Sequence, residues 1–446
     1  MDGVTIFKNA RIISEGKISE GDLLVIGDKI EKIDSTIDHH GVEIDCNGNY
    51  LMPGIIDDQV HFREPGLTHK ATIATESRAA VAGGVTSFME MPNTNPPATT
   101  LALLENKYDI ARNCSPANYS FFLGATEHNL SEILSADYYK ICGVKIFMGS
   151  STGSLIVEDD QALEQIFAQC PALIATHCED EFKIRTNLEK IKHKYGELVS
   201  AAMHPQIRTA EGCYLSSFKA TSLAKKYGTR LHILHISTEK EISLFNNAID
   251  RKVKRITAEA CVHHMYFDQS DYALLGNKIK CNPAIKRRED KEAILQAVLD
   301  GYIDVIATDH APHTFEEKSK PYFEAPAGLP LVQHTLLIML SHYKNKKISL
   351  EQIIDKMCHA PADIFQITER GYLKEGFKAD IVLFNTDQTT RITKENLLYK
   401  CAWSPLEGKE MNGRILSTWV NGQLVFDGQK ILGNNPGERL NFDFTN

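Results

Sequence analysis

Histidine and aspartate side chains stand at the ends of several short apolar runs in this 446-residue sequence. His61, His177 and His235 each lie near the carboxyl end of such a run, and Asp309 follows another. Imidazole nitrogens and carboxylate oxygens are suitable ligands for zinc in an open catalytic site. A divalent metal held in this way activates water at neutral pH and polarises a carbonyl group. The residue types therefore favour metal-dependent hydrolysis, provided that the fold brings the four side chains together.

The apolar runs alternate with helical patterns between residues 52 and 371. The first run begins at about Met52. The runs after it are Ser87–Met91, Tyr119–Leu123, Gly143–Phe147, Leu173–His177, Leu231–Ile236, Ile256–Ala260 and Ile303–Thr308. The helical patterns between them include Ala71–Ala82, Leu101–Arg112, Asp160–Ala168, Gln206–Lys226 and Asp290–Leu299. This alternation predicts an α/β protein, and the repeat number predicts an (α/β)8 TIM-like barrel. The carboxyl ends of barrel strands meet at one mouth, where catalysis takes place, so we expect the four side chains to converge there.

Both ends of the chain are rich in β patterns. Residues 1–51 hold short β-rich runs separated by turn signals, which predict a small antiparallel sheet. The β pattern returns beyond residue 372, where Asn421-Gly422 predicts a hairpin turn. We therefore expect one composite, β-sandwich-like small domain made of residues 1–51 and 372–446, beside a barrel domain of residues 52–371.

Composition and charge exclude several classes of protein. The formal net charge is −9, and the acidic residues are scattered, whereas nucleic acids and anionic membranes require clustered basic residues. The ten cysteines include no CxxC pair, so neither a disulfide framework nor a cysteine zinc site is expected. The sequence has no secretory signal pattern and no apolar run of membrane-spanning length. We expect a cytoplasmic protein with a small-molecule substrate, no nucleic-acid or membrane partner, and homo-oligomeric assembly.

Six short motifs follow one another in the order of a known family. They are DDQVHFREPG (Asp57–Gly66), MPNTNPP (Met91–Pro97), GVKIFM (Gly143–Met148), THCED (Thr176–Asp180), LHILHIST (Leu231–Thr238) and ATDHAPH (Ala307–His313). Each motif alone is weak. In this order and at barrel-like spacing, they resemble the cyclic amidohydrolases and, among them, the dihydroorotases. The resemblance extends from about Met52 to Leu383 and continues weakly into both β-rich ends.

The resemblance implies a set of metal ligands. They are His61, Lys145, His177, His235 and Asp309, with Gln59 as a doubtful sixth member. One or two zinc ions would bind, and Lys145 would carry a carbamate, formed with CO2, that bridges two of them. The neighbours of Lys145 predict a strand whose lysine faces the interior, where an unpaired ammonium group is costly. The stretch Ser150–Gly153 offers no carboxylate that would replace the carbamate.

The resemblance also implies a reaction. A hydroxide shared by the metals would attack the ring amide carbonyl of dihydroorotate and give N-carbamoyl-L-aspartate, a reversible step of pyrimidine synthesis. Asp309 would be the general base and acid, taking the proton during attack and passing it to the leaving ring nitrogen.

Substrate recognition would depend on an anion clamp, because dihydroorotate carries a ring carboxylate. Arg63 offers that carboxylate a bidentate guanidinium group. By resemblance, Asn93 and His313 would complete the clamp, while Asn282 and the backbone around Ala327 would contact the ring imide. Allantoinases and hydantoinases lack the arginine as a rule, yet another cyclic amidase of this kind is the nearest alternative.

Gln59 is the one departure among the metal positions, since the family pattern is His-x-His and this chain has Gln59-Val60-His61. An amide oxygen is a weaker zinc ligand than imidazole. Three outcomes are open. The outer metal binds weakly through Gln59, His61, the carbamate and Asp309; or only the metal held by Lys145, His177 and His235 is present; or the chain is a non-catalytic partner of a pyrimidine-pathway enzyme.

The remaining polar residues of the motifs have supporting roles in this interpretation. His232 and His263–His264 are expected to pack or to orient other groups, and Glu179 and Glu259 to hold the ligating histidines. The charged, proline-containing stretch Thr314–Pro330 is the candidate for a loop that covers the substrate.

Overall fold

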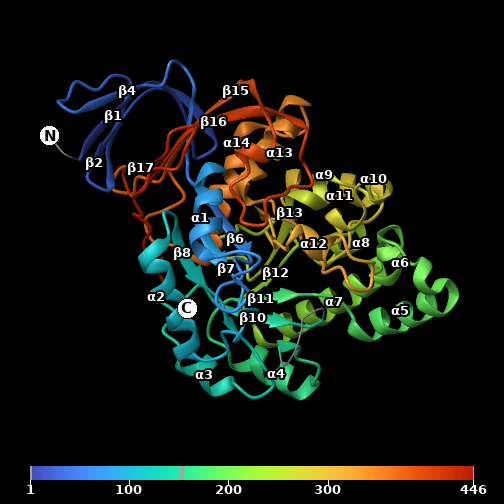
Figure 1. Ribbon diagram of the computed structural model, residues 1–446. Coiled ribbons are helices and arrows are strands. Elements are labelled where there is room, and N and C mark those ends of the chain that lie inside the picture. Colours follow the sequence, from blue (N-terminus) through green and yellow to red (C-terminus); the bar gives the residue numbers. More distant parts are fainter. Residues whose placement is uncertain (1–2, 150–154, 445–446) are drawn as a thin grey trace.

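Parallel strands close into a barrel in the computed structural model, which describes residues 3–149 and 155–444 (Figure 1). One sheet has the order β6-β7-β8 and a second has the order β14-β13-β12-β11-β10-β9, with every pairing parallel. β8 leads into β9 along the chain. Across the remaining seam, the His61 amide donates to the His310 carbonyl. The predicted (α/β)8 barrel is confirmed.

The barrel strands are short and lie close to the predicted runs. They are β6 (Ile55–Val60), β7 (Val85–Glu90), β8 (Asn118–Phe121), β9 (Leu123–Gly124), β10 (Val144–Phe147), β11 (Ile174–His177), β12 (Leu231–Ile233), β13 (Ile256–Cys261) and β14 (Val305–Ala307). Nearly all their residues are buried, because helices cover the outside and side chains fill the inside. Ile56, Leu173 and Val305 belong to one apolar cluster near the amino ends of the strands.

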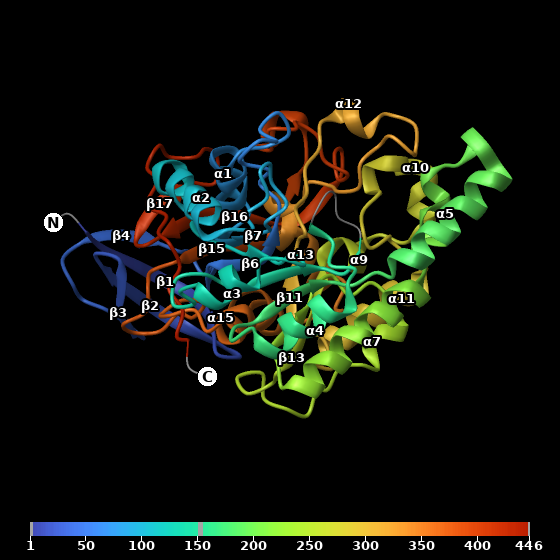
Figure 2. The same ribbon diagram turned by 90° about the horizontal axis from the view of Figure 1, so that it is seen from below.

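Helices surround the barrel, as Figures 1 and 2 show together. They are α1 (Ile73–Ala82), α2 (Leu101–Cys114), α3 (Leu130–Ser135), α4 (Asp160–Gln169), α5 (Glu181–Tyr195), α6 (His204–Ile207), α7 (Ala210–Tyr227), α8 (Glu239–Ile242), α9 (Val262–Tyr266), α10 (Tyr272–Leu275), α11 (Arg288–Leu299), α12 (Phe315–Lys318), α13 (Thr335–Lys344), α14 (Leu350–Ile354) and α15 (Ala360–Phe365). Threonine and aspartate caps begin several of them; Thr72, for example, accepts from the Thr75 amide at 3.1 Å.

One of the predicted helices begins later than expected. The pattern Gln206–Lys226 predicts a single helix, but α7 begins at Ala210, after the N-cap Thr209, and α6 is a separate short turn. Thr209 accepts from the Gly212 amide at 3.2 Å, and Arg208 leaves the helical region of backbone conformation. A side-chain cap therefore ends the continuity that the hydrophobic pattern alone suggests.

Strands from both ends of the chain form one further sheet beside the barrel, where blue and red strands lie side by side in Figure 1. Its order is β17-β16-β15-β5-β1-β2-β3, with β4 paired to β1. The strands are β1 (Val4–Ser14), β2 (Lys17–Ile26), β3 (Lys29–Asp34), β4 (Val42–Asp45), β5 (Tyr50–Pro53), β15 (Ile381–Arg391), β16 (Glu410–Val420) and β17 (Gln423–Phe426).

The sheet corrects the expectation of a purely antiparallel arrangement, because β1 pairs in parallel with both β4 and β5. The predicted hairpin at Asn421-Gly422 joins β16 to β17, and both residues have positive φ, 49° and 73°. A type I′ turn requires such angles, which asparagine and glycine adopt readily. The residue bounds of the two expected domains stay a prediction, and β5 spans the boundary expected at residue 51.

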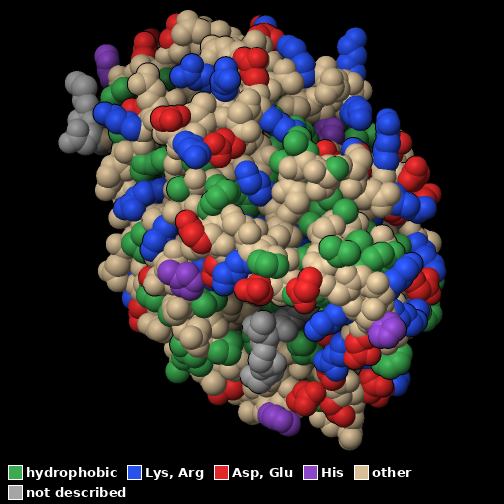
Figure 3. All heavy atoms as spheres, turned by 45° about the vertical axis from the view of Figure 1, so that its right-hand side comes forward, with side chains coloured by type: hydrophobic (Ala, Val, Ile, Leu, Met, Phe, Trp, Pro, Cys, Tyr) green, Lys and Arg blue, Asp and Glu red, His purple; other side chains and the backbone are tan. Residues whose placement is uncertain are grey.

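The surface carries both signs of charge. On the face shown in Figure 3, Lys and Arg side chains are interspersed with Asp and Glu side chains rather than gathered into one patch. All ten cysteines are free thiols. Among the described helices, none has the length and apolar character needed to cross a membrane.

Candidate active site

A cavity of about 80 Å³ opens at the carboxyl ends of the barrel strands. Its wall contains most of the predicted site residues: Gln59, His61, Arg63, Asn93, Lys145, His177, His235, Asn282, Asp309 and Ala327. Phe147, Ala311 and Gly328 complete the wall. His313 lies beside it, with Nε2 3.0 Å from an Arg63 guanidinium nitrogen. The fold thus brings together residues that are up to 269 positions apart in the sequence, Gln59 and Gly328.

Asp309 faces the first-strand motif across the cavity. Its Oδ1 lies 3.0 Å from His61 Nε2 and accepts from Gln59 Nε2 at 3.2 Å. The other ring nitrogen of His61, Nδ1, lies 2.7 Å from Asn93 Oδ1 and donates to it. Burial alone would raise the pKa of Asp309, but the hydrogen bond and charge of His61 lower it below its usual value. Asp309 is therefore an ionised carboxylate with one imidazole nitrogen directed at it.

His177, the last residue of β11, faces His235, which lies two residues beyond the end of β12. His177 Nδ1 lies 2.9 Å from His235 Nε2, and His177 Nε2 lies 2.9 Å from Glu179 Oε2. Arg208 pairs with the same Glu179 oxygen. Burial lowers the pKa of both imidazoles, so they are neutral at pH 7 and carry lone pairs. A carboxylate that fixes the far nitrogen of a histidine is typical of metal sites.

Lys145 is buried in the barrel interior, as its strand neighbours predict. It is 1% exposed, and no described residue forms a hydrogen bond or ion pair with its Nζ, which lies 4.7 Å from the centre of the Phe147 ring. Burial lowers its pKa to about 7. A large fraction of this amine is therefore neutral and nucleophilic at physiological pH. The stretch Ser150–Gly153 lies outside the described residues.

Three site residues have left-handed backbone conformations. Arg63, His235 and Asp309 have φ angles of 70°, 41° and 46°. Residues other than glycine adopt such angles at a cost, and they persist where the surrounding structure fixes them, often at functional sites. All three of these residues line the cavity at the mouth of the barrel.

Arg63 is a buried cation that has no counter-ion among the described residues. It is 7% exposed, and none of the described carboxylates lies within ion-pair distance of its guanidinium group. Its Nε donates to the Pro312 carbonyl at 3.1 Å, and its backbone amide donates to Glu90 at 3.1 Å. Burial lowers its pKa to about 10, which still leaves it charged at pH 7. A charged, desolvated guanidinium group on a cavity wall is suited to binding an anionic group of a ligand.

The remaining predicted substrate contacts stand around this cation. His313 Nε2 lies 2.9 Å from the Ala327 carbonyl, and Lys70 Nζ lies 3.1 Å from His313 Nδ1. Asn282 is held from behind by His204, whose Nε2 is 3.1 Å from Asn282 Oδ1. Ala327 and Gly328 belong to the stretch Thr314–Pro330, which thus supplies part of the cavity wall.

Sequence reasoning missed the pair that orients Arg63. Glu90, at the end of β7, accepts from the backbone amides of Phe62 and Arg63 and lies 2.6 Å from Lys107 Nζ, with both side chains buried. A charged residue inside the apolar run Ser87–Met91 was the available signal. Phe147, which lines the cavity, was noted only as a strand residue.

The donor set suits a divalent metal. Imidazoles of His61, His177 and His235 converge with the Asp309 carboxylate and a buried lysine amine that has no partner among the described residues. Nitrogen and oxygen donors of these types bind zinc, and second partners already orient two of the imidazoles.

Comparison with known proteins defines the class. The model of the amidohydrolase family matches residues 50–425. The chain belongs to the amidohydrolase family.

Within that family, the resemblance to dihydroorotases is confirmed over almost the whole chain. The dihydroorotase of Methanosphaera stadtmanae is 32% identical and aligns over 85% of this chain and 86% of the relative. That of Bacillus cytotoxicus is 32% identical over 96% and 99% of the two chains. The solved L-hydantoinase of Arthrobacter aurescens superposes with a TM-score of 0.93 at 26% identity, covering 98% and 99%. The chain is therefore an enzyme of the cyclic amidohydrolase type.

Proposed function

We propose that the chain interconverts dihydroorotate and N-carbamoyl-L-aspartate. The observation that carries this proposal is Arg63, a buried guanidinium group without a carboxylate partner among the described residues, on the wall of the same cavity as Asp309. A neutral cyclic amide would leave that charge unpaired in the closed site, which is costly. Dihydroorotate brings a carboxylate that pairs with it. Similarity to dihydroorotases at about one third identity supports the same substrate.

Zinc is the proposed metal, as one or two ions per chain. His61, His177, His235, Asp309 and a carboxylated Lys145 would hold it. Bound zinc would supply Lewis acidity for water and for the scissile carbonyl. Burial without a partner among the described residues supports the carbamate. The neutral amine forms an N–C bond to CO2 and releases one proton to solvent, and the resulting anion, which binds metal, replaces an unpaired ammonium group. Gln59 weakens the outer position, since its amide is a poorer ligand.

Proton transfer is assigned to Asp309. During hydrolysis, a water oxygen bonds to the ring carbonyl carbon, and the bond from that carbon to the ring nitrogen breaks. Asp309 takes the proton of the attacking water and returns it to the leaving nitrogen. Its low pKa keeps it ionised for the first of these transfers. Asn93 fixes the ring of His61 and thereby the nitrogen that faces Asp309.

Substrate binding is assigned to four other residues. Arg63 and His313 would bind the carboxylate of dihydroorotate, and Asn282 with Ala327 would bind the imide edge of its ring.

The proposal is tested by assaying the purified, zinc-loaded enzyme on dihydroorotate, allantoin and hydantoin. We expect turnover of dihydroorotate alone. The Arg63→Ala variant should lose about 100-fold in kcat/KM, because truncating a buried charge partner costs about 3 kcal/mol. Its zinc content should not change. The matched control is Arg185→Ala, an exposed arginine on α5 paired with Glu158. Turnover of hydantoin without turnover of dihydroorotate would overturn the proposal.

Two alternative functions would give different results in these experiments. A hydantoinase-type activity is favoured by the close structural match to an L-hydantoinase and would appear in the same assay. A non-catalytic role beside another pyrimidine-pathway enzyme would appear as less than one zinc per chain and no turnover. A cytoplasmic location and homo-oligomeric assembly belong to the proposal, and light scattering of the purified protein tests the assembly.

A further inference from the structure

Three buried polar side chains meet inside the barrel, away from the cavity. Asp58 on β6, His232 on β12 and Glu259 on β13 are each 0% exposed. Each offers one ligand atom, and the three atoms lie within 4.8 Å of one another. None of the three residues lines the candidate active site. We refer to them as the interior triad.

Thr257 fixes the protonation pattern of His232. The Thr257 hydroxyl donates to the Leu231 carbonyl at 3.3 Å, so its oxygen accepts from His232 Nδ1 at 2.8 Å. Nδ1 therefore carries a ring proton. Nε2 is directed toward the interior triad, and in the Nδ1–H tautomer it offers a lone pair to a metal.

The carboxylates leave their inner oxygens unused. Asp58 Oδ2 lies 3.0 Å from His232 Nε2 and Glu259 Oε2 lies 3.9 Å from it, yet neither contact has hydrogen-bond geometry. Both Asp58 oxygens, Glu259 Oε2 and His232 Nε2 lack a hydrogen-bond partner among the described residues. Glu259 Oε1, by contrast, accepts from the His235 backbone amide at 3.0 Å and from Cys261 at 3.2 Å.

Such an arrangement is costly without a cation. Both carboxyl groups can be ionised in this fully buried space only with a cation, because two carboxylates repel each other there and an ion without a partner in the protein interior costs several kcal/mol. A divalent ion would neutralise both charges and use the four unpaired atoms at once. One imidazole and two carboxylates form a common ligand set for zinc and for similar first-row metals.

We propose that Asp58, His232 and Glu259 bind a divalent cation of the zinc class in the barrel interior, separate from the metal site at the mouth. Glu259 connects the two sites, because its other oxygen holds the His235 backbone. The interior ion would thus fix β6, β12 and β13 against one another beneath the catalytic centre. This assigns His232 and Glu259 a ligand role, whereas the sequence suggested only packing and orientation.

The test is anomalous diffraction at the zinc edge on crystals of the zinc-loaded protein, together with metal content per chain. We expect a peak between the three side chains and one zinc fewer in Asp58→Asn than in the unaltered protein. The absence of a peak there, with equal zinc in both proteins, would overturn the proposal. It would indicate that the triad instead shares protons.

Two further variants keep the result interpretable. If Asp58→Asn does not fold, Thr257→Val removes only the group that fixes His232 and should weaken interior zinc binding about 10- to 100-fold. An unchanged interior affinity would count against the proposal. His177→Ala removes a ligand at the mouth and should leave the interior peak in place. In the unaltered protein, an interior zinc peak with no zinc at the mouth and no turnover of dihydroorotate would overturn the proposed function but support this inference.

Discussion

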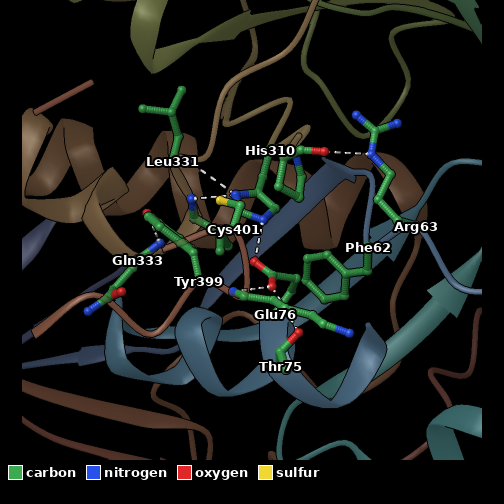
Figure 4. Close-up of polar contacts among 12 residues, drawn as sticks. Phe62, Arg63, Thr75, Glu76, His310, Leu331, Gln333, Tyr399 and Cys401 are labelled. Atoms are coloured by element: carbon green, nitrogen blue, oxygen red, sulfur yellow. Dashed lines mark hydrogen bonds and ion pairs between the residues drawn. The ribbon is translucent and has the colours of Figure 1, made fainter. Parts of the chain in front are cut away.

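His310 donates from Nε2 to Glu76 Oε2 at 2.8 Å, in a contact where both side chains are 0% exposed. Figure 4 shows Glu76 reaching from α1 toward this ring. His310 Nδ1 accepts from the backbone amides of Leu331 and Val332, at 2.9 and 3.2 Å, which places the proton on Nε2. His310 directly follows Asp309, so the pair fixes the backbone that carries the proposed catalytic carboxylate.

The His310→Ala variant should therefore be less stable and less active. It leaves the Glu76 carboxylate and two backbone amides without their ring partner in the core, at a cost of about 3 to 5 kcal/mol. We expect this loss in urea unfolding and a lower kcat. Glu76→Gln is the matched control, because its amide oxygen still accepts from His310 Nε2. We expect it to lose less than half of the unfolding free energy that His310→Ala loses. Equal losses in the two variants would contradict the assigned role of the ring.

The Asp309→Asn variant should keep the fold and lose catalysis. The amide fills the same space but cannot take a proton, so we expect kcat to fall by about 10² to 10⁴. Steady-state kinetics with circular dichroism as a folding control measure this. A kcat within threefold of the unaltered enzyme would exclude Asp309 as the general base.

The Gln59→His variant should bind zinc more tightly. Imidazole is a better zinc ligand than an amide, and the gain should be about 10-fold or more in affinity. Competition with a chromogenic chelator measures it, and Gln59→Leu, which has no ligand atom, should fall in the opposite direction. If all three proteins bind zinc equally, position 59 does not contact the metal.

The Glu179 carboxylate should make stability depend on pH. Burial alone would raise its pKa, but Arg208 and His177 lower it from 4.5 to about 2. A group with a lowered folded-state pKa stabilises the fold fully above its ordinary pKa, and this contribution is lost as the pH falls from 4.5 toward 2. In metal-free protein, Glu179→Gln should be less stable by about 3 kcal/mol at pH 7.

The difference between Glu179→Gln and the unaltered protein should shrink when urea unfolding is repeated at pH 3. The exposed Glu158–Arg185 pair provides the control, since Glu158→Gln should cost less than about 1 kcal/mol at either pH. A difference that does not vary with pH would show that Glu179 is not the titrating group.

Lys318 should stabilise the wall of the cavity. Its buried ammonium group donates to the carbonyls of Lys280, Pro326 and Gly328, at 3.1, 2.9 and 2.8 Å. Lys318→Met leaves these acceptors unpaired, so we expect a loss of about 2 to 3 kcal/mol and a higher KM. The nearby exposed Lys320→Met should change neither quantity. An unaltered KM in Lys318→Met would show that the stretch Thr314–Pro330 does not contribute to substrate binding.

The sequence by itself determined the architecture and the list of candidate residues. Alternating strand and helix patterns depend on local periodicity, so the barrel and the Asn421-Gly422 hairpin could be predicted from short windows. The same rule of barrel geometry predicted that His61, His177, His235 and Asp309 would converge, because strand ends share one mouth. The helix expected to begin at Gln206 begins instead at Ala210, because the Thr209 side chain caps it there; hydrophobic periodicity does not predict such a cap.

Only the tertiary structure decided which partners these residues have. Arg63 could equally have formed a surface salt bridge by its sequence; its burial without a carboxylate partner among the described residues depends on the surrounding Pro312, His313 and Glu90. The Glu76–His310 pair and the interior triad each join residues more than 170 positions apart. Such pairings follow from strand register and side-chain packing across the whole barrel, which no local window of sequence contains.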